Sequence, residues 1–560
     1  MPSLPLRLIA LSCGLALTVF GCNAILGLDK LSVEATQPKD AGNGKGGAKS
    51  TMPPMPDSGT GGMPDSMAPG GCQTNQECVT RLSMQATGQA GADGGVVPAV
   101  CLKDVHQCAA LLSDDCTTIT GDYLDDHAVI LGTLFSTKGA QAATNLPRQQ
   151  SAMLAAEEIN AVGGVPGPTV DAPRPLVLVS CDESTNLMRA GGHLITDLHV
   201  PAIVGPNTSQ DTLDLSNKLS IAGGTVVMTP TGVASSIADL TDNDLTWLMV
   251  PTDVQRAPLM ISQINDLETQ LKSQRNEAHV KLGVIYRNDA LGIGTRTSLD
   301  TLVLNGKPIS DPVNLGQNVK ISPYDYTQPD QTTIVNDYLT FLPDIIVLAG
   351  TAEAITKVMV PLEQKWPKSE SDAGRRPSYV LIDSVKVPDL ITAVTGNNDL
   401  RRRIRGTGVT PSPSSVAVNN AFQIDYSARY PMSSATISGM GPSYDALYGI
   451  AYALAATKDM PASGSGIASG LRSLAGGATT IQNSGTKALA AFQKLAAGDK
   501  ITAIGTFGPM EWDQNGAVVG GTLEMWCIDG SGSTPTYRSS GLTYDIKGQA
   551  FSGSYTQCGP

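Results

Sequence analysis

The run HAVILGT, at residues 127–133, is the first of several short apolar segments that alternate with helical patterns as far as residue 230. A helical pattern at 147–162 leads to LVLVS at 176–180, and further helical patterns lead to AIV at 202–204 and TVVMT at 225–229. Strand–helix–strand units at this spacing predict a parallel sheet with right-handed crossovers. Such sheets bind ligands at the carboxyl ends of their strands, so this stretch predicts a binding scaffold.

The same alternation returns later in the chain. VKLGVIY at 280–286, DIIVLA at 344–349 and SYVLI at 378–382 are predicted strands, with helices after 292 and at 352–364. SYDALYGIAYALAA at 443–456 predicts a strong buried helix, and GTFGPMEWD at 505–513, followed by the turn QNG, predicts a terminal hairpin. There are two strand–helix series, and the chain returns to the first one late in the sequence. This order predicts two lobes joined by several crossovers.

Length and composition agree with this organisation. The chain has 560 residues, which is too long for one core, and its 41% hydrophobic content is sufficient for a large core. Aromatic residues make up 4%, while 59 glycines and 36 prolines indicate disordered linker beside compact α/β structure. The formal net charge of −13 argues against nucleic acid as a partner, because phosphate binding needs a basic surface.

The first residues have the pattern of an export signal. Arg7 precedes an apolar segment at 8–20, and Val19-Phe20-Gly21-Cys22 ends it, which predicts a signal peptide over residues 1–21. This ending resembles a bacterial lipoprotein box, in which the cysteine after the cut is lipidated, so Cys22 is the predicted lipid attachment. Ordinary cleavage that leaves Cys22 as a free thiol is the alternative. No later segment approaches the ~20 apolar residues of a spanning helix, which predicts a soluble protein, periplasmic or on the cell surface, tethered by lipid.

A tether and a cysteine-rich module follow. Residues 22–71 are the predicted tether, because Gly, Pro, Met, Asp, Ser and Lys dominate them from about residue 35 and cannot offset the entropy of ordering. Residues 72–119 are the predicted module. Eight of the ten cysteines follow Cys22, and an even count in an exported protein predicts disulfides. The candidates are Cys72, Cys78, Cys101, Cys108, Cys116, Cys181, Cys527 and Cys558.

The positions of the last four cysteines suggest how they pair. Cys116 lies just before the first strand and Cys181 just after the second, so these two are expected to pair, and Cys527 and Cys558 are expected to close the carboxyl-terminal tail. The pairing among the first four stays open. The spacing of residues 101–108 also suggests a metal site, but zinc prefers closer cysteine pairs, so no metal is predicted.

Several motifs follow one another in an order that resembles a known family. They are EEIN at 157–160 with GGV at 163–165, Cys181-Asp182, GPNTS at 205–209, MTPTGV at 228–233, PTD at 251–253 and YDA at 444–446. This order resembles the type I periplasmic binding proteins, in particular the leucine/isoleucine/valine-binding family, over about residues 128–515. The resemblance implies an α/β binding domain at 120–560, after the small disulfide-rich module, with two lobes that each hold a parallel sheet flanked by helices. Lobe 1 is expected at about 120–251 plus 385–500, and lobe 2 at about 252–384 plus 501–560.

The resemblance also implies where a ligand binds. The family holds its ligand's carboxylate at strand ends that lead into helices, where unpaired N–H groups and the helix dipole attract an anion. The corresponding residues here are Asn207, Thr208, Ser209, Thr229 and Thr231. The alternative is that these side chains only cap helices.

In lobe 2, Asp383, beside Ser384, is the candidate for receiving a ligand's ammonium; the alternative is a solvated charge at a strand end. The sequence departs from the family at three positions. Val233 replaces a second threonine, Leu291 falls in the segment where the family has an aromatic residue, and Thr351 replaces another aromatic residue. The loss of the aromatic walls weakens the case for an aliphatic amino acid. Leu291, Thr351, Asp383 and Ser384 complete the predicted ligand-binding set.

No catalytic pattern is present in the sequence. The five histidines, His106, His127, His193, His199 and His279, have no metal-binding spacing, and neither a G-x-S-x-G elbow nor a phosphate-binding P-loop occurs. LGIGT at 291–295 lacks the full dinucleotide fingerprint. The sequence therefore predicts a protein that is not an enzyme and needs no cofactor.

These observations predict an extracytoplasmic solute-binding lipoprotein. It would capture a small carboxylate-bearing or amino-acid-like ligand in a cleft between its lobes and present it to an ABC-type permease. Its predicted partners are the small-molecule ligand, a membrane permease and the membrane through the lipid anchor only. The alternative is a ligand sensor or a surface interaction protein that uses the same fold.

Overall fold

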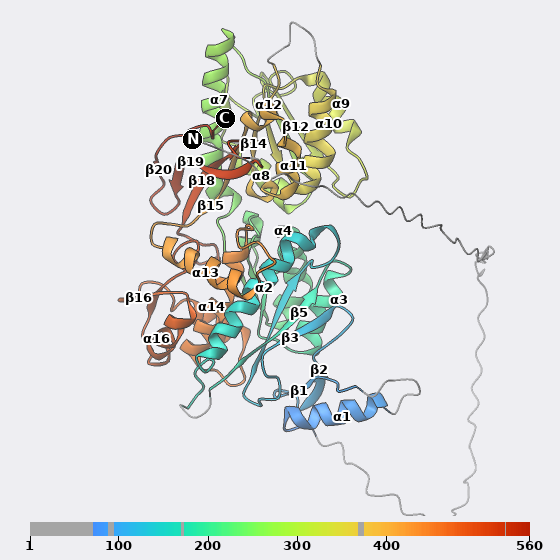
Figure 1. Cartoon of the computed structure of the whole chain (residues 1–560), viewed down its shortest axis with the longest axis vertical. Coiled ribbons are helices and arrows are strands. Elements are labelled where there is room, and N and C mark those ends of the chain that lie inside the picture. The colour runs from blue at the N-terminus through green and yellow to red at the C-terminus, as the bar shows by residue number, and fades with distance from the viewer. Residues whose placement is uncertain (1–70, 88–94, 170–172, 368–374, 533, 560) are drawn as a thin grey trace, which may run out of the picture. The chain divides into compact units, whose positions relative to one another are not determined.

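The computed structural model describes residues 71–87, 95–169, 173–367, 375–532 and 534–559 (Figure 1). The predicted signal peptide, Cys22 and nearly all of the predicted tether lie outside these residues. Within the described ranges, no helix combines the length and the apolar character that crossing a membrane requires. The same ranges form a small disulfide-linked module and two α/β lobes.

Lobe 1 is built on a six-stranded sheet with the order β3-β5-β4-β6-β7-β8. All its neighbouring strands are parallel except β3 and β5, which are antiparallel. The predicted boundary of the module after residue 119 is therefore wrong, because β3 belongs to this sheet. The strands are β3 (Cys116–Thr120), β4 (Val129–Phe135), β5 (Leu176–Asp182), β6 (Ala202–Val204), β7 (Val226–Thr229) and β8 (Thr246–Leu248).

Helices cover both faces of this sheet. Side chains alternate along each strand, so Leu131 packs under α2 and α14, whereas Leu134 packs under α3 and α4. Because both faces are buried, the strands appear in the sequence as continuous apolar runs rather than as alternating ones. The helices are α2 (Ala142–Ala161), α3 (Leu187–Gly192), α4 (Ser209–Leu215), α14 (Met440–Thr457), α15 (Gly464–Leu471) and α16 (Gly485–Ala496).

The EEIN motif has a structural role at the end of α2. Glu158 accepts hydrogen bonds from the hydroxyls of Tyr444 and Tyr448, both at 2.6 Å, which links α2 to α14. Asn160 exchanges two hydrogen bonds of 2.8 Å with the backbone of Leu176 at the start of β5. The helix begins at Ala142, earlier than the predicted start at Pro147, and the proline lies inside its second turn.

Lobe 2 is built on an eight-stranded sheet with the order β12-β9-β13-β14-β15-β18-β19-β20. The five strands from β12 to β15 are parallel, and β18, β19 and β20 extend the sheet in antiparallel fashion. The strands are β9 (Leu282–Arg287), β12 (Val319–Tyr324), β13 (Ile345–Ala349), β14 (Ser378–Leu381), β15 (Ile404–Thr410), β18 (Thr522–Asp529), β19 (Thr536–Asp545) and β20 (Ala550–Ser552).

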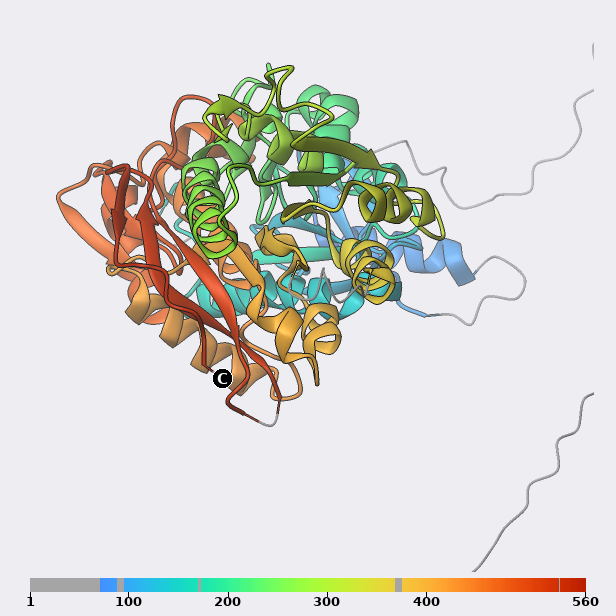
Figure 2. The same cartoon turned by 90° about the horizontal axis from the view of Figure 1, so that it is seen from above.

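The helices of lobe 2 also lie on both faces of its sheet. Apolar side chains of α7 pack on one face, and those of α9, α10 and α11 pack on the other. Figure 2 shows α7, in light green, beside the red strands β18 and β19. The helices are α7 (Asp253–Arg275), α8 (Ala290–Ser298), α9 (Thr332–Phe341), α10 (Val360–Lys365), α11 (Pro388–Val394) and α12 (Asn398–Arg402).

The division between the lobes differs from the expected one. β15 pairs with β14, so residues 385–410 belong to lobe 2 and not to lobe 1. The chain crosses between the lobes at the start of α7, between β15 and α13 (Val416–Arg429), and between β17 (Ile501–Ile504) and β18. Thr252 and Gln255 form a capping box at the first crossing, which fixes the direction of α7.

The predicted hairpin at 505–516 is present only as a short one around the turn at 514–516, where Asp513 N–H donates to Ala517 O at 2.8 Å, and it is not the terminal element. This segment is the third crossing, and it contains the isolated antiparallel bridges Ile504–Pro509 and Trp512–Val518. The small parallel pair of β16 (Thr479–Gln482) and β17 precedes it. The long antiparallel strands of the carboxyl terminus come only afterwards.

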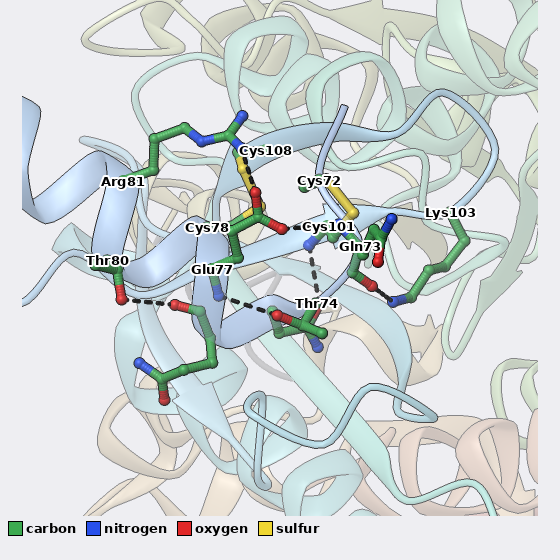
Figure 3. Close-up of a disulfide and its surroundings, with 12 residues drawn as sticks. Cys72, Gln73, Thr74, Glu77, Cys78, Thr80, Arg81, Cys101, Lys103 and Cys108 are labelled. Carbon is green, nitrogen blue, oxygen red and sulfur yellow. Dashed lines mark hydrogen bonds and ion pairs between the residues drawn. A yellow bond between two sulfur atoms is a disulfide. The ribbon is translucent and has the colours of Figure 1, made fainter. Parts of the chain in front are cut away.

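The cysteine-rich module consists of α1 (Asn75–Thr87), β1 (Ala99–Leu102) and β2 (Gln107–Ala110). Disulfides join Cys72 to Cys101 and Cys78 to Cys108, and Figure 3 shows the first of these near Gln73 and Lys103. The sulfurs of Cys72, Cys78 and Cys101 lie close enough to one another to hold a metal ion, but all three are used in disulfides.

The remaining disulfides join Cys116 to Cys181 and Cys527 to Cys558, which confirms both expected pairs. The module packs on lobe 1. Asn75 donates hydrogen bonds from its Nδ2 to the backbone oxygens of Tyr123 at 2.9 Å and Asp125 at 3.0 Å. These contacts lie near the amino-terminal ends of the lobe 1 strands, away from the ends where ligands bind in such sheets.

Candidate functional site

A cavity of about 820 Å³ lies between the two lobes, and we call it the interlobe cavity. It is bounded by the start of α2, by α13 and by residues 432–442 from lobe 1, and by α11 and the ends of β14 and β15 from lobe 2. Phe422, Met440 and Phe507 contribute apolar wall. Small-molecule sites are commonly concave and mostly apolar, with volumes of roughly 300–1,000 Å³. The interlobe cavity therefore has the size and character of a ligand site.

Asp383 is the predicted site residue that lines this cavity. It follows β14 and begins a short 3₁₀ turn. Its Oδ2 lies 2.5 Å from Nη1 of Arg256, and the two side chains are 14% and 5% exposed. Arg256 comes from the first turn of α7, so this ion pair joins the crossing helix to the carboxyl end of a lobe 2 strand.

Besides Asp383, the guanidinium of Arg256 has one other hydrogen-bond acceptor, and one of its nitrogens has no acceptor. Its Nε donates to the backbone oxygen of Pro251 at 2.9 Å. Its Nη2 is buried, and no described residue accepts a hydrogen bond from it. An unpaired buried donor is costly, so this nitrogen is a natural position for an acceptor.

Arg148, on α2, brings a second guanidinium to the same region. Its Nε donates to the backbone oxygen of Ser438 at 2.7 Å, and its Nη1 donates to Oδ1 of Asn145 at 2.7 Å. Ser438 and its neighbour Gly439 line the cavity. Burial lowers the pKa of Arg148 to about 10, and the negative charge of Asp383 opposes this shift. Arg148 therefore stays charged at neutral pH and lies within electrostatic reach of Asp383.

The lobe 1 residues predicted from the strand ends hold two turns together. Thr208 caps α4 by accepting a hydrogen bond from the backbone N–H of Asp211. Ser209 accepts from the backbone N–H groups of Val233 and Ala234, at 3.0 and 3.2 Å.

The turn after β7 is tied back to the turn after β6. Thr229 donates to the backbone oxygen of Pro206 at 2.8 Å, and Thr231 donates to Oδ1 of Asn207 at 2.6 Å. These residues do not line the interlobe cavity, but Thr231 adjoins its wall, because a Cβ on Gly439 would come within 2.4 Å of its Cγ2.

The other lobe 2 residues of the predicted set also make internal contacts. Thr351 donates to the carboxylate of Glu353, and Ser384 donates to the backbone oxygen of Gly350 at 2.6 Å. Leu291 lies in α8 and packs against the core between α7 and the sheet. Of the nine predicted residues, all within the described ranges, Asp383 alone is part of the cavity lining.

On the side of α4 and α8, the lobes touch directly. Ala290 donates its backbone N–H to Oε1 of Gln210 at 3.3 Å, and a Cβ on Gly294 would collide with Asp253 at 1.8 Å. The glycine at this position therefore allows α8 to lie close to the start of α7, at the first crossing between the lobes.

A second group of charged side chains lies at this contact. Nε of Arg287 is 2.6 Å from Oδ2 of Asp289, and its guanidinium lies 3.6 Å from the centre of the Tyr326 ring. Burial raises the pKa of Asp211 across the contact, and the charge of Arg287 opposes the shift. Burial, followed by the charge of Asp211, also raises the pKa of Glu183. These residues form a contact between the lobes that is separate from the interlobe cavity.

Sequence reasoning missed Arg148 and Arg256. Arg148 lies in the helix predicted at 147–162, and Arg256 lies in α7, which the sequence pattern did not predict. Each interacts with a residue far away in the chain. An arginine on a helix is usually solvated, and no local pattern distinguishes it from one that points into a cavity. Lys386, which lines the cavity, was missed because its partner is equally far away in the chain; its Nζ is 3.5 Å from Glu524 Oε1.

No protein-family model and no curated protein matches this chain. Solved structures do resemble it. The branched-chain amino acid transporter substrate-binding protein LivJ of Streptococcus pneumoniae, solved with isoleucine, is 16% identical with a TM-score of 0.51, over 74% of this chain and 99% of that one. The leucine-binding protein LivK of Thermotoga maritima is 16% identical with a TM-score of 0.52, over 74% and 98%.

A solute-binding protein of an ABC transporter from R. palustris, solved with benzoate, is also similar. It is 11% identical with a TM-score of 0.50, over 77% of this chain and 98% of that one. At such identities the likeness concerns the fold. Each of these chains is covered almost completely, and the part of this chain that they match includes both lobes. The chain therefore has the two-lobed fold of the type I periplasmic binding proteins.

Proposed function

We propose that this protein is an extracytoplasmic solute-binding protein that holds a small carboxylate-bearing ligand in the interlobe cavity. The observation that carries the proposal is the cavity itself, which is largely apolar and has Asp383, the partner of Arg256, in its wall. An apolar wall with a few convergent charged groups is the usual composition of a small-molecule site. The nine residues predicted from the sequence remain candidates for the ligand's surroundings, with Asp383 in the lining.

The arrangement of the lobes supports binding by closure. Both lobes contribute to the cavity wall, and three crossing segments join them. A ligand that contacts both lobes would favour the conformation in which they are close together, which is the hinge motion of two-lobed receptors. We further propose that the closed form delivers the ligand to an ABC-type permease, and that a lipid on Cys22 holds the protein at a bacterial membrane.

A second candidate is a ligand sensor or surface interaction protein with the same fold. The observation in its favour is the module formed by α1, β1 and β2, which two disulfides hold together and which packs on lobe 1 far from the cavity. A transport receptor does not need such an addition. Recovery of a permease as the binding partner would favour transport, and recovery of a signalling protein would favour sensing.

Native mass spectrometry of the purified full-length protein tests the proposal directly, because a bound small molecule would be detected as added mass. A panel of carboxylates and amino acids would then be screened by melting temperature and small-angle scattering. A true ligand at about a hundred times its Kd should stabilise the protein by about 2.7 kcal/mol, and it should reduce the radius of gyration. The proposal fails if no compound in a broad panel changes either quantity.

A further inference from the structure

The charges around Asp383 indicate what kind of ligand the interlobe cavity accepts. Arg256 already neutralises Asp383, at 2.5 Å and with little exposure to solvent. Arg148 adds a second positive charge close enough to act on the same carboxylate. Lys386 and Glu524, the other charged residues in the lining, form an ion pair with each other, so their charges cancel. The carboxylate of Asp383 therefore faces two guanidinium groups, from Arg256 and Arg148.

An ammonium group would be disfavoured here. To reach Asp383 it would have to displace Arg256, which would leave a buried guanidinium without its counter-charge. It would also approach Arg148, whose charge repels it. A free Asp383 would be the acceptor for the ammonium of an amino acid, but in this structure that acceptor is occupied.

A carboxylate would be favoured for complementary reasons. Arg148 keeps Nη2 without an acceptor among the described residues, and its neighbours Ser438 and Gly439 line the cavity. An arginine fork binds a carboxylate with strong, directional hydrogen bonds. The wall beyond it is apolar, with Phe422, Met440 and Phe507, and suits a hydrophobic body.

We propose that the interlobe cavity takes an organic acid with a carboxylate and an apolar body but without an ammonium group. The inference rests on the proposed solute-binding function and specifies its substrate class. Arg148 receives the carboxylate. Arg256 is a specificity residue, which acts by occupying Asp383.

Matched pairs of ligands test this inference by isothermal titration calorimetry. L-leucine is compared with 4-methyl-2-oxopentanoate, and L-phenylalanine with phenylpyruvate, because each pair differs only in an oxo group that replaces the ammonium. The full-length protein should bind at least one oxo acid, and bind it about tenfold or more tightly than its amino acid partner. Equal or tighter binding of the amino acids would overturn the inference while leaving the proposed function intact. Binding of none of the four, nor of any compound in the broader panel, would instead overturn the proposed function.

Three variants separate the roles of the charged residues. Arg148→Gln should weaken oxo-acid binding by about 10- to 100-fold, because it removes a charged hydrogen-bond donor. Arg256→Gln should free Asp383, so that amino acids bind more tightly than they bind to the unmodified protein. Asp383→Asn removes the nearest negative charge without changing the size of the side chain, so oxo-acid affinity should rise.

The control is Arg429→Gln, which removes an exposed arginine paired with Glu157 on the surface of lobe 1 and should leave every affinity unchanged. Circular dichroism and melting curves establish that each variant is folded. If Arg256→Gln does not fold, Asp383→Asn still decides the question. A loss of ligand binding in Asp383→Asn would show that the carboxylate itself receives the ligand, and would contradict the inference.

Discussion

Ser209, Thr229 and Thr231 lie where the family resemblance places ligand-binding hydroxyls, and each has a hydrogen-bond partner within the protein. A hydroxyl at a strand end that precedes a helix meets the unpaired N–H groups of the neighbouring turn. Capping and ligand binding use the same donors and the same geometry, so the residue type alone does not distinguish the two roles. The contacts of each side chain with the next turn show which hydroxyls join turns of the protein.

Asp445, on α14, is buried and holds the third crossing in place. It accepts hydrogen bonds from the backbone N–H and the hydroxyl of Thr506, at 2.7 and 2.6 Å, and from Asn483 Nδ2 at 2.8 Å. Thr506 lines the interlobe cavity. Burial raises the pKa of Asp445 from 3.8 to about 6, against the effect of these hydrogen bonds.

We expect Asp445 to make the free energy of unfolding depend on pH, and Asp445→Asn to remove this dependence. Because the folded-state pKa lies above the unfolded value, this carboxyl stabilises the fold fully below about pH 4 and loses that contribution as pH rises through 6. The free energy of unfolding of the unmodified protein, relative to Asp445→Asn, should therefore fall by about 2 kcal/mol between pH 4 and pH 7.5. Urea unfolding of both proteins at the two pH values measures this difference. An identical pH dependence in the two proteins would contradict it.

The strands that the sequence predicts differ in burial and composition from the strands that it does not predict. β4, β5, β7 and β13 are apolar runs buried on both faces, so they are visible without any knowledge of their neighbours. β15 reads IRGTGVT, and β19 reads TYRSSGLTYD with exposed positions along its length. Glycine and polar residues weaken the local strand signal, and pairing with β14 and β18 stabilises these strands instead.

Gly470, on α15, permits a close approach between α15 and α14 in lobe 1. A Cβ at this position would lie 2.4 Å from the backbone oxygen of Ala453 on α14, and backbone cannot move aside as a flexible side chain can. Gly470→Ala should therefore reduce the free energy of unfolding by about 1–3 kcal/mol. Chemical denaturation measures the change.

Gly192 supplies the matched control, because it also lies in a helix of lobe 1 but has no atom within 4 Å of the position of a Cβ. Gly192→Ala should be neutral or stabilising by up to about 1 kcal/mol, because alanine favours the helix. If both alanine variants lose the same amount of stability, the contact at Gly470 is not the cause.

At the level of the whole molecule, the chain order of the lobes follows from the sheets. Lobe 1 starts, lobe 2 interrupts it, the chain returns for α13 to β17, and lobe 2 is completed by β18 to β20. The cysteine-rich module packs near the amino ends of the lobe 1 strands, whereas the interlobe cavity is lined from lobe 1 by the start of α2, by α13 and by residues 432–442.

Membrane attachment through Cys22 is a prediction about the entire chain. Expressed in a bacterium with lipoprotein processing, the protein should incorporate labelled palmitate and partition into detergent. Cys22→Ser should abolish both, because the thiol that carries the lipid is gone. Cys13→Ser is the control, since Cys13 lies within the apolar segment before the cut and should have no effect. Detergent partitioning of Cys22→Ser like that of the unmodified protein would refute lipid attachment at Cys22.

The sequence by itself determined the α/β class and the two series of parallel strands, and it suggested the pairs Cys116–Cys181 and Cys527–Cys558. These features depend on local apolar runs and on the positions of cysteines along the chain, which can be read without coordinates. Only the tertiary structure decided that residues 385–410 belong to lobe 2, that most of the predicted hydroxyls join turns, and that Arg256 neutralises Asp383. The physical reason is that ion pairs, strand pairing and cavity walls join residues far apart in the chain, and no local pattern records which distant residue each one meets.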